Sequence, residues 1–167
     1  MSLDRQPTLT GPTLRLRPLT DADREALYAV AGDPLIWEQH PSDRYRRVEF
    51  DEFFDDALRS GGALVVETLD GDVIGTSRFH VPGAPGPLEI GWTFLARSHW
   101  GGSTNQELKR LMLDHAFGAV GRVHFSVAPH NYRSRRAVEK LGATCLPDLR
   151  PDGHVVYELR RSDWHAV

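Results

Sequence analysis

A glycine-containing turn before a helical pattern is the first feature of this sequence that could bind a ligand. The turn reads Trp100-Gly101-Gly102-Ser103-Thr104-Asn105 and follows a strand-like segment at 88–95. Small residues let the backbone approach a ligand closely, and the first amides of a helix have no partners within that helix. With the positive end of the helix dipole, those amides form an anion site that suits a pyrophosphate. The phosphate-loop pattern Gly-x-x-x-x-Gly-Lys-Ser/Thr and the dinucleotide pattern Gly-x-Gly-x-x-Gly are both absent.

A second segment, beginning at Asn131, combines an amide side chain with clustered positive charge. Asn131 follows a β-rich run at 122–128 and can hydrogen-bond another amide. Ser134 lies at the start of a short predicted helix. Three arginines concentrate positive charge where a phosphate-bearing ligand could lie: Arg133, Arg135 and Arg136.

The elements that must position these segments alternate between strand and helix patterns. Residues 14–19 alternate with period two, and Thr20 is a helix N-cap. The spacing of Phe50, Phe53 and Phe54 predicts a second helix, and Asp70-Gly71 predicts a hairpin. Two further strands are expected at about 143–149 and 154–159. The expected order is β-α-α-β-β-β-α-β-α-β-β, which is typical of an α+β or α/β domain.

The opposite face of the second helix is acidic, with Asp51, Glu52, Asp55 and Asp56. The pattern allows a solvated face or a patch that attracts an amine, and the solvated face is the commoner of the two.

The two chemistry-bearing segments resemble the GNAT superfamily of N-acyltransferases, and among them the branch with the ribosomal-protein alanine N-acetyltransferases. That branch typically reads Trp-Gly-x-Gly-x-Ala-x-Glu in the turn and Asn-x-x-Ser-x-x-Ala-x-Glu-Lys-Leu-Gly in the later segment. The later pattern matches throughout, from Asn131 to Gly142. The turn matches at Trp100, Gly101 and Glu107, whereas Ser103 and Asn105 replace a glycine and a small residue. The resemblance covers about residues 10–160.

The resemblance implies an α+β, GNAT-like fold, with a central, mostly antiparallel mixed sheet whose strands splay, flanked by about four helices. We expect one domain over residues 1–167. The co-substrate implied is acetyl-CoA, with Phe94 and Leu95 offering backbone groups to its pantetheine arm. The pyrophosphate would lie on Gly101, Gly102, Ser103, Thr104 and Asn105, with Trp100 beside the turn. Asn131 and Ser134 would contact the lower pantetheine or a nearby phosphate.

The implied reaction is transfer of an acetyl group to a primary amine, on a protein N-terminus or a small molecule, by direct attack. Glu89 is the candidate base, acting directly or through water, although an outward-facing strand carboxylate is the alternative. Trp37 and Trp92 are expected near the acceptor, with ordinary packing as the alternative for each. Val138 stands where many relatives have a tyrosine acid, which leaves water to protonate the departing thiolate.

Composition excludes several function classes. A net charge of −3 gives no overall electrostatic basis for nucleic-acid binding. No apolar run approaches the ~18 residues of a membrane helix, and the N-terminus lacks the apolar core of a signal peptide. The single Cys145 and scattered histidines do not indicate a metal site. We therefore expect a soluble, cytoplasmic protein without a metal; a homodimer and the identity of the acceptor amine stay open.

Two other classes of function compete with an active transferase. Ser103, Asn105 and the missing tyrosine are compatible with a catalytically weak, CoA-binding regulatory or partner module. The same helix N-terminus could instead serve a nucleotide-binding protein.

Overall fold

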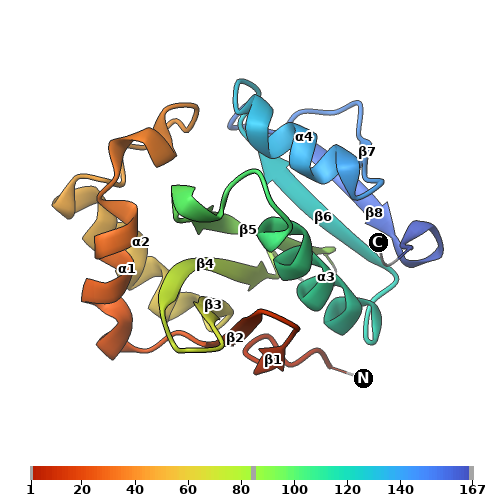
Figure 1. Cartoon of the computed structure of the whole chain (residues 1–167). Helices are drawn as coiled ribbons and strands as arrows, with labels where there is room; N and C mark the ends of the chain where they lie inside the picture. The colour runs from red at the N-terminus through yellow and green to blue at the C-terminus, as the bar shows by residue number, and fades with distance from the viewer. Residues whose placement is uncertain (1, 84–85, 166–167) are drawn as a thin grey trace.

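The computed structural model describes residues 2–83 and 86–165, and within them one eight-stranded sheet has the order β1-β2-β3-β4-β5-β6-β8-β7 (Figure 1). The pair β5–β6 is parallel, and the other neighbouring strands are antiparallel. The strands are β1 Leu9–Thr10, β2 Leu14–Pro18, β3 Ala63–Thr68, β4 Val73–His80, β5 Leu88–Leu95, β6 Arg122–Val127, β7 Thr144–Cys145 and β8 Val155–Arg160. The expected mixed, mostly antiparallel sheet is confirmed.

Helices cover both faces of this sheet. They are α1 Arg24–Ala31, α2 Arg47–Ser60, α3 Thr104–Phe117 and α4 Tyr132–Lys140. One hydrophobic cluster joins the sheet to α3 and α4 and includes Leu108, Met112 and Val138. A second cluster, on the α1 and α2 side, includes Phe50 and Phe54. The sheet therefore separates two cores.

Local sequence signals explain most element boundaries. Phe50, Phe53 and Phe54 are buried on one side of α2, and Gly61 ends that helix with a φ of 66°. Gly71, at a φ of 92°, forms the predicted turn between β3 and β4.

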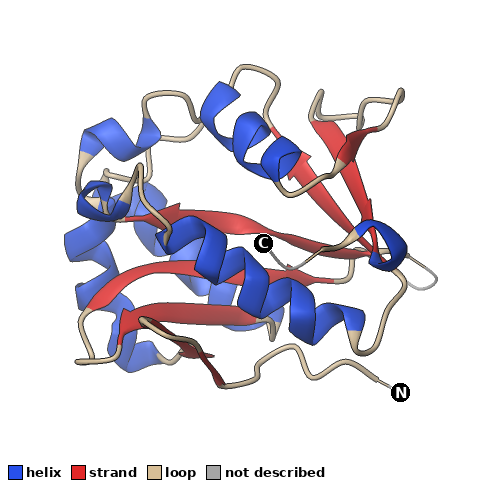
Figure 2. Cartoon of the chain, turned by 45° about the vertical axis from the view of Figure 1, so that its right-hand side comes forward, coloured by secondary structure: helices blue, strands red, loops and turns tan. Residues whose placement is uncertain are grey.

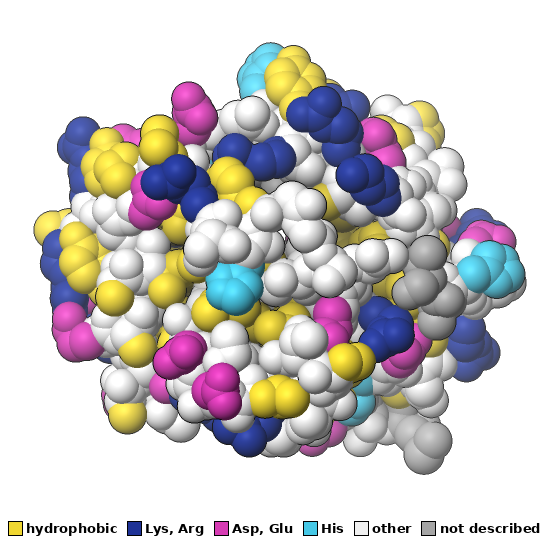
Figure 3. Space-filling view, in the orientation of Figure 1, with side chains coloured by type: hydrophobic (Ala, Val, Ile, Leu, Met, Phe, Trp, Pro, Cys, Tyr) yellow, Lys and Arg dark blue, Asp and Glu magenta, His cyan; other side chains and the backbone are white. Residues whose placement is uncertain are grey.

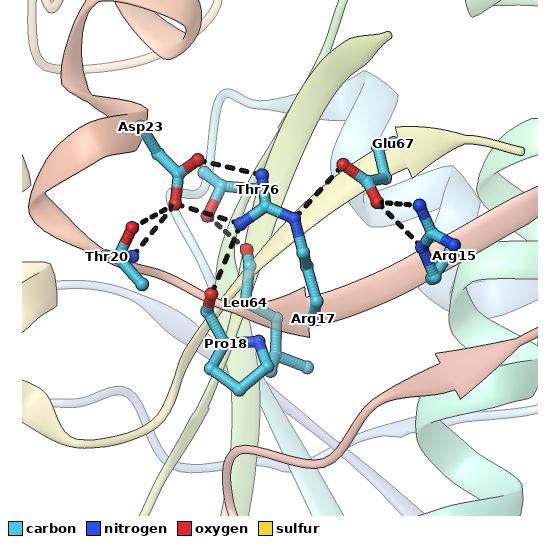
Figure 4. Close-up of polar contacts among 8 residues, drawn as sticks. All are labelled: Arg15, Arg17, Pro18, Thr20, Asp23, Leu64, Glu67 and Thr76. Atoms are coloured by element: carbon cyan, nitrogen blue, oxygen red, sulfur yellow. Dashed lines mark hydrogen bonds and ion pairs between the residues drawn. The ribbon is translucent and has the colours of Figure 1, made fainter. Parts of the chain in front are cut away.

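A partly buried ion network fixes β2 against the start of α1 (Figure 4). Arg17 donates to both oxygens of Asp23, at 2.8 and 3.0 Å, and to Glu67 at 3.1 Å. Burial raises the pKa of Asp23, but hydrogen bonds from Arg17 and Thr20 outweigh it and hold that pKa below its ordinary value. Because Arg15 and Arg17 balance the charges of Asp23 and Glu67 within the scaffold, this network is structural.

Three boundaries differ from the sequence-based expectation. The strand expected at about 143–149 is shortened to β7, Thr144–Cys145. The amide of Leu146 still donates to the carbonyl of Val156, but the next residue, Pro147, has no N–H with which to continue the pairing. Helix α4 begins at Tyr132 rather than Ser134, since Asn131 is its N-cap. The short strand β1 was not predicted; it pairs back on β2 through a turn in which Gly11 donates to Leu14.

The strands β5 and β6 diverge partway along their length (Figure 2). They pair only at Leu88↔Val123 and Glu89↔His124, whereas β6 pairs with β8 along its whole length. On its other side β5 carries a bulge, because Thr76 faces Phe94 while Arg78 already faces Gly91. Beyond Glu89 the β6-facing edge of β5 thus has no strand partner within the described residues.

Among residues 2–83 and 86–165, no helix combines the length and apolar character needed to cross a membrane.

Candidate functional site

The start of α3 offers backbone amides that the rest of the described chain does not use. Its first helical bond runs from the amide of Glu107 to the carbonyl of Ser103, at 2.9 Å, and the Ser103 side chain makes no cap. Gly101, at a φ of 75°, adopts a conformation that favours glycine, and the turn from Gly101 to Ser103 is exposed. A Cβ at Gly102 would meet nothing within 4 Å, so space is open above this turn. These unpaired backbone donors can accept an anion.

Two side chains hold this turn and its helix in place. The indole N–H of Trp100 donates to the carbonyl of Leu95 at 3.0 Å, and the guanidinium of Arg133 lies 4.1 Å from the Trp100 ring. Glu107 accepts from the amide and the hydroxyl of Thr13, at 3.1 and 2.7 Å. Trp100 therefore brings together the two segments singled out in the sequence, while Glu107 anchors α3 to the N-terminal strands.

The start of α4, in contrast, is closed by side chains. The Oδ1 of Asn131 accepts from the amide of Ser134 at 3.3 Å. The Oε1 of Gln39, in the loop between α1 and α2, accepts from the amide of Arg133 at 3.1 Å. Basic side chains nonetheless gather over α4 (Figure 3), where Arg133, Arg135 and Arg136 lie.

Glu89 lies where β5 and β6 begin to diverge. It faces His80 on β4 and His124 on β6, and only 2% of its surface is exposed. Its Oε2 accepts from Arg150 at 2.8 Å, whereas Oε1 accepts no hydrogen bond within the described residues. The carboxylate is therefore covered by the loop before β8 and retains one unused oxygen.

Phe94 and Leu95, which are expected to contact the pantetheine arm, lie on β5 beyond the point where it leaves β6. The Phe94 ring packs against Trp37, with centroids 5.2 Å apart, and against Phe53 at 6.0 Å. The carbonyl of Leu95 is already bonded to Trp100.

The two tryptophans expected near the acceptor have different environments. Trp37 is 4% exposed, and its indole N–H donates to the carbonyl of Ala31 at 2.8 Å, so it anchors the loop between α1 and α2. Trp92 is half-buried on the bulge of β5 and, at a φ of 52°, is the one non-glycine residue with a positive φ in the described part of the chain. Its ring lies 5.1 Å from that of His80. Trp92 thus presents a partly free ring and Trp37 does not.

Sequence reasoning missed Lys109, which is 5% exposed on the sheet-facing side of α3. Its Nζ donates to the hydroxyl of Thr93 at 2.8 Å and lies 5.9 Å from the Phe125 ring, so it sits between β5 and β6. Burial lowers the pKa of Lys109 to about 8. The sequence does indicate that Lys109 is buried, because residues 109, 112, 113 and 116 share one helical face and the other three are apolar.

In the part of the chain that the structure describes, no three His, Cys, Asp or Glu side chains come together to hold a metal ion.

Comparisons with known proteins all identify acetyltransferases as similar to this chain. A family model described as an acetyltransferase (GNAT) domain matches residues 13–144. The acetyltransferase from Agrobacterium tumefaciens str. C58 is 25% identical, with 93% of this chain and 95% of that chain covered and a TM-score of 0.78. A T. thermophilus protein classed with the acetyltransferases is 31% identical over 94% of this chain and 90% of its own, with a TM-score of 0.70.

A third structure, Mycobacterium smegmatis RimJ in complex with CoA-disulfide, shares the fold at 23% identity. The alignment covers 97% of this chain and 91% of that chain, with a TM-score of 0.72.

Proposed function

The chain belongs to the GNAT family of acyl-CoA-dependent N-acetyltransferases, and on that premise we propose that it acetylates a primary amine of a protein N-terminus or a small molecule. The observation that carries the proposal is the start of α3, whose uncapped amides follow the end of β5, the strand that leaves β6 after Glu89. Free donors for phosphate and an unpaired strand edge for an extended amide chain are what acetyl-CoA requires.

Acetyl-CoA fits the residues around this turn. The amides from Gly101 to Asn105 would hold the pyrophosphate, and the open space above Gly102 supports this placement. The open edge of β5 near Phe94 and Leu95 would receive the pantetheine arm, with Trp100 beside the turn. Asn131 commits its Oδ1 to the α4 cap, which leaves its Nδ2 and the Ser134 hydroxyl to contact the cofactor.

The chemistry that acetyl-CoA supplies is an activated thioester carbonyl. In the proposed step Glu89 takes a proton from the acceptor ammonium, directly or through water held at Oε1. The amine nitrogen then bonds to the carbonyl carbon and the carbon–sulfur bond breaks. The second proton of that nitrogen passes through water to the leaving thiolate, which departs as the thiol. Backbone amides at the bulge of β5 would stabilise the oxyanion. Val138, at the usual tyrosine position, is buried and apolar, which is why water is assigned the last proton.

The acceptor side would lie on the α1 and α2 face. There the loop anchored by Trp37 meets the bulge that presents Trp92. The match from Asn131 to Gly142 supports the ribosomal-protein alanine N-acetyltransferase branch, and a protein N-terminus is therefore one of the two acceptor classes proposed.

The test measures thiol release from acetyl-CoA across a panel of amines, together with thermal stabilisation by acetyl-CoA. We expect Glu89→Gln to lower kcat by about 10²–10⁴ and to keep the acetyl-CoA-induced thermal shift. Glu158→Gln, which also removes a paired carboxylate beside His124, should leave kcat within a few fold. Binding of acetyl-CoA without turnover of any amine would instead favour a CoA-binding module, and stabilisation by ATP rather than CoA would favour a nucleotide-binding protein.

A further inference from the structure

Arg78 on β4 is a buried cation with too few partners. It is 3% exposed, and its Nη1 donates to Asp56 at 2.8 Å. Its Nε and Nη2 are also buried and have no hydrogen-bond partner within the described residues. A guanidinium in this condition has two donors that an anion could take.

A second guanidinium lies near the same aromatic ring as the first. Arg44, in the loop between α1 and α2, lies 4.5 Å above the Phe53 ring, and Arg78 lies 5.9 Å from the same ring. Burial, followed by the charge of Arg78, lowers the pKa of Arg44 to about 10, although Asp56 and Glu49 oppose this. Arg44 is thus protonated at neutral pH, and within residues 2–83 and 86–165 it forms no ion pair.

These two side chains lie at the bulge of β5. Arg78 faces Gly91 across the β4–β5 pair, and its guanidinium lies 4.5 Å from the Trp92 ring. Phe53, which both arginines contact, packs on Phe94. The arginine pair therefore lies on the α1 and α2 face of the strand segment assigned to the acyl group, on the side opposite α3.

The acidic face of α2 supplies a counter-charge to only one of these two arginines. Asp51 and Asp55 bind Arg24 at 3.1 and 2.6 Å, and Asp51 also binds Arg47. Asp56 serves Arg78 alone and is largely exposed. Three of the four carboxylates on this face are thus engaged with arginines, and Arg44 and Arg78 place positive charge next to the bulge.

We propose that Arg44 and Arg78 bind an anionic group, a carboxylate or a phosphate, carried by the acceptor amine itself. The inference rests on the proposed acetyl transfer and specifies its acceptor. An anion at this position would fill the unpaired donors of Arg78 and relieve the repulsion between the two guanidiniums. The same charges disfavour polyamines and other acceptors that carry only positive charge.

The test compares matched acceptors that differ in one charge. Common α-amino acids are assayed beside their carboxamides, and O-phosphoethanolamine beside ethanolamine, by thiol release from acetyl-CoA. The anionic member of at least one pair should have a kcat/KM at least about tenfold higher, and the pair that shows this identifies carboxylate or phosphate. Arg44→Gln should abolish the preference and retain the acetyl-CoA thermal shift. Arg46→Gln, in the same loop with a side chain 64% exposed, should retain both.

A binding experiment tests this inference independently of acetyl transfer. The same amines are titrated by calorimetry into the acetyl-CoA-free protein. Binding of an anionic probe that its neutral partner lacks, and that Arg44→Gln removes, supports the inference even if no acetyl group is transferred. The inference is overturned if both members of each pair are bound or turned over equally, or if the neutral member is preferred. It is also overturned if no anionic probe is bound or turned over. Because Arg78→Gln could unfold the chain, the Arg44 variant decides the result.

Discussion

Helices α3 and α4 start beside the diverging strands, and they differ in whether side chains occupy the backbone amides at their N-termini. At α3 the amides after Ser103 have no side-chain partner, whereas at α4 the amides of Arg133 and Ser134 are taken by Gln39 and Asn131. The sequence of α4 is the more basic of the two, yet its backbone is the less available. Positive side chains and a helix dipole thus do not by themselves leave backbone amides available to a ligand.

The largest effect should come from placing charge at the open terminus. Gly102→Asp adds a carboxylate where the pyrophosphate is proposed, and the exposed turn accommodates the side chain without a clash. The loss of charge-assisted hydrogen bonds should raise the Kd for acetyl-CoA by about tenfold to a hundredfold. Calorimetric titration measures this, with Gly121→Asp, another glycine with open space around its Cβ, as the control. Equal affinities of the two variants would contradict an anion site at α3.

The next effect concerns the cation buried under α3. The folded chain releases the Lys109 proton near pH 8, but the unfolded chain holds it to about pH 10.5, so its burial costs roughly 3 kcal/mol at pH 7. Lys109→Met removes this cost and loses the bond to Thr93, for a net gain of about 2 kcal/mol in the free energy of unfolding.

The sign of the pH dependence follows from the lowered pKa. Between pH 8 and 10.5 the unfolded chain binds more protons than the folded chain, so wild-type stability rises with pH and the advantage of Lys109→Met disappears. Urea unfolding at pH 7 and pH 10 measures both variants against Lys140→Met, which removes the other lysine, exposed at the end of α4. A constant difference across this range would mean that Lys109 titrates normally.

A smaller effect should follow from opening the closed terminus. Asn131→Ala removes the α4 cap and should cost about 1 kcal/mol, a lowering of Tm by roughly 2–4 °C. Asn131→Asp restores the cap but not the N–H donors of the amide. If Asn131 also contacts acetyl-CoA, both variants will bind it more weakly although only the alanine variant is destabilised; if both bind it normally, Asn131 is a cap alone.

The smallest effect should come from Gln39→Ala, which frees the amide of Arg133. The half-exposed hydrogen bond should contribute about 0.5 kcal/mol. Hydrogen exchange should quicken at Arg133 and in the loop between α1 and α2, while Gln106→Ala, exposed on α3, leaves both unchanged. Unchanged exchange in the Gln39 variant would show that the loop is held by other contacts.

The sequence predicted the elements whose formation depends on residues only a few positions apart. The apolar stripe of Phe50, Phe53 and Phe54 and the Asp70-Gly71 turn predicted α2 and the β3–β4 hairpin, because both patterns act within a few residues. The glycine turn predicted a helix directly after it, although α3 starts at Thr104, two residues earlier than the pattern indicated. The resemblance supplied the family and the splayed strands.

Contacts between distant segments could not be predicted in this way. Nothing near Arg133 indicates that Gln39, 94 positions away, takes its amide. The partner of Glu89, Arg150, lies 61 positions away, and the unpaired donors of Arg78 exist only once the sheet has formed. Whether a helix terminus is open, or a cation satisfied, is decided by these long-range neighbours.

The anchoring of Glu107 by Thr13 has a consequence for synthesis of the chain. The contact joins residues 94 positions apart, so the first strands emerge long before the helix that covers them. At typical translation rates that delay is roughly 5–20 s. During it, Leu14 and Leu16, which end in the core beside α3, have no native cover. The nascent N-terminal hairpin therefore exposes these two leucines until α3 has been synthesised and can pack on them.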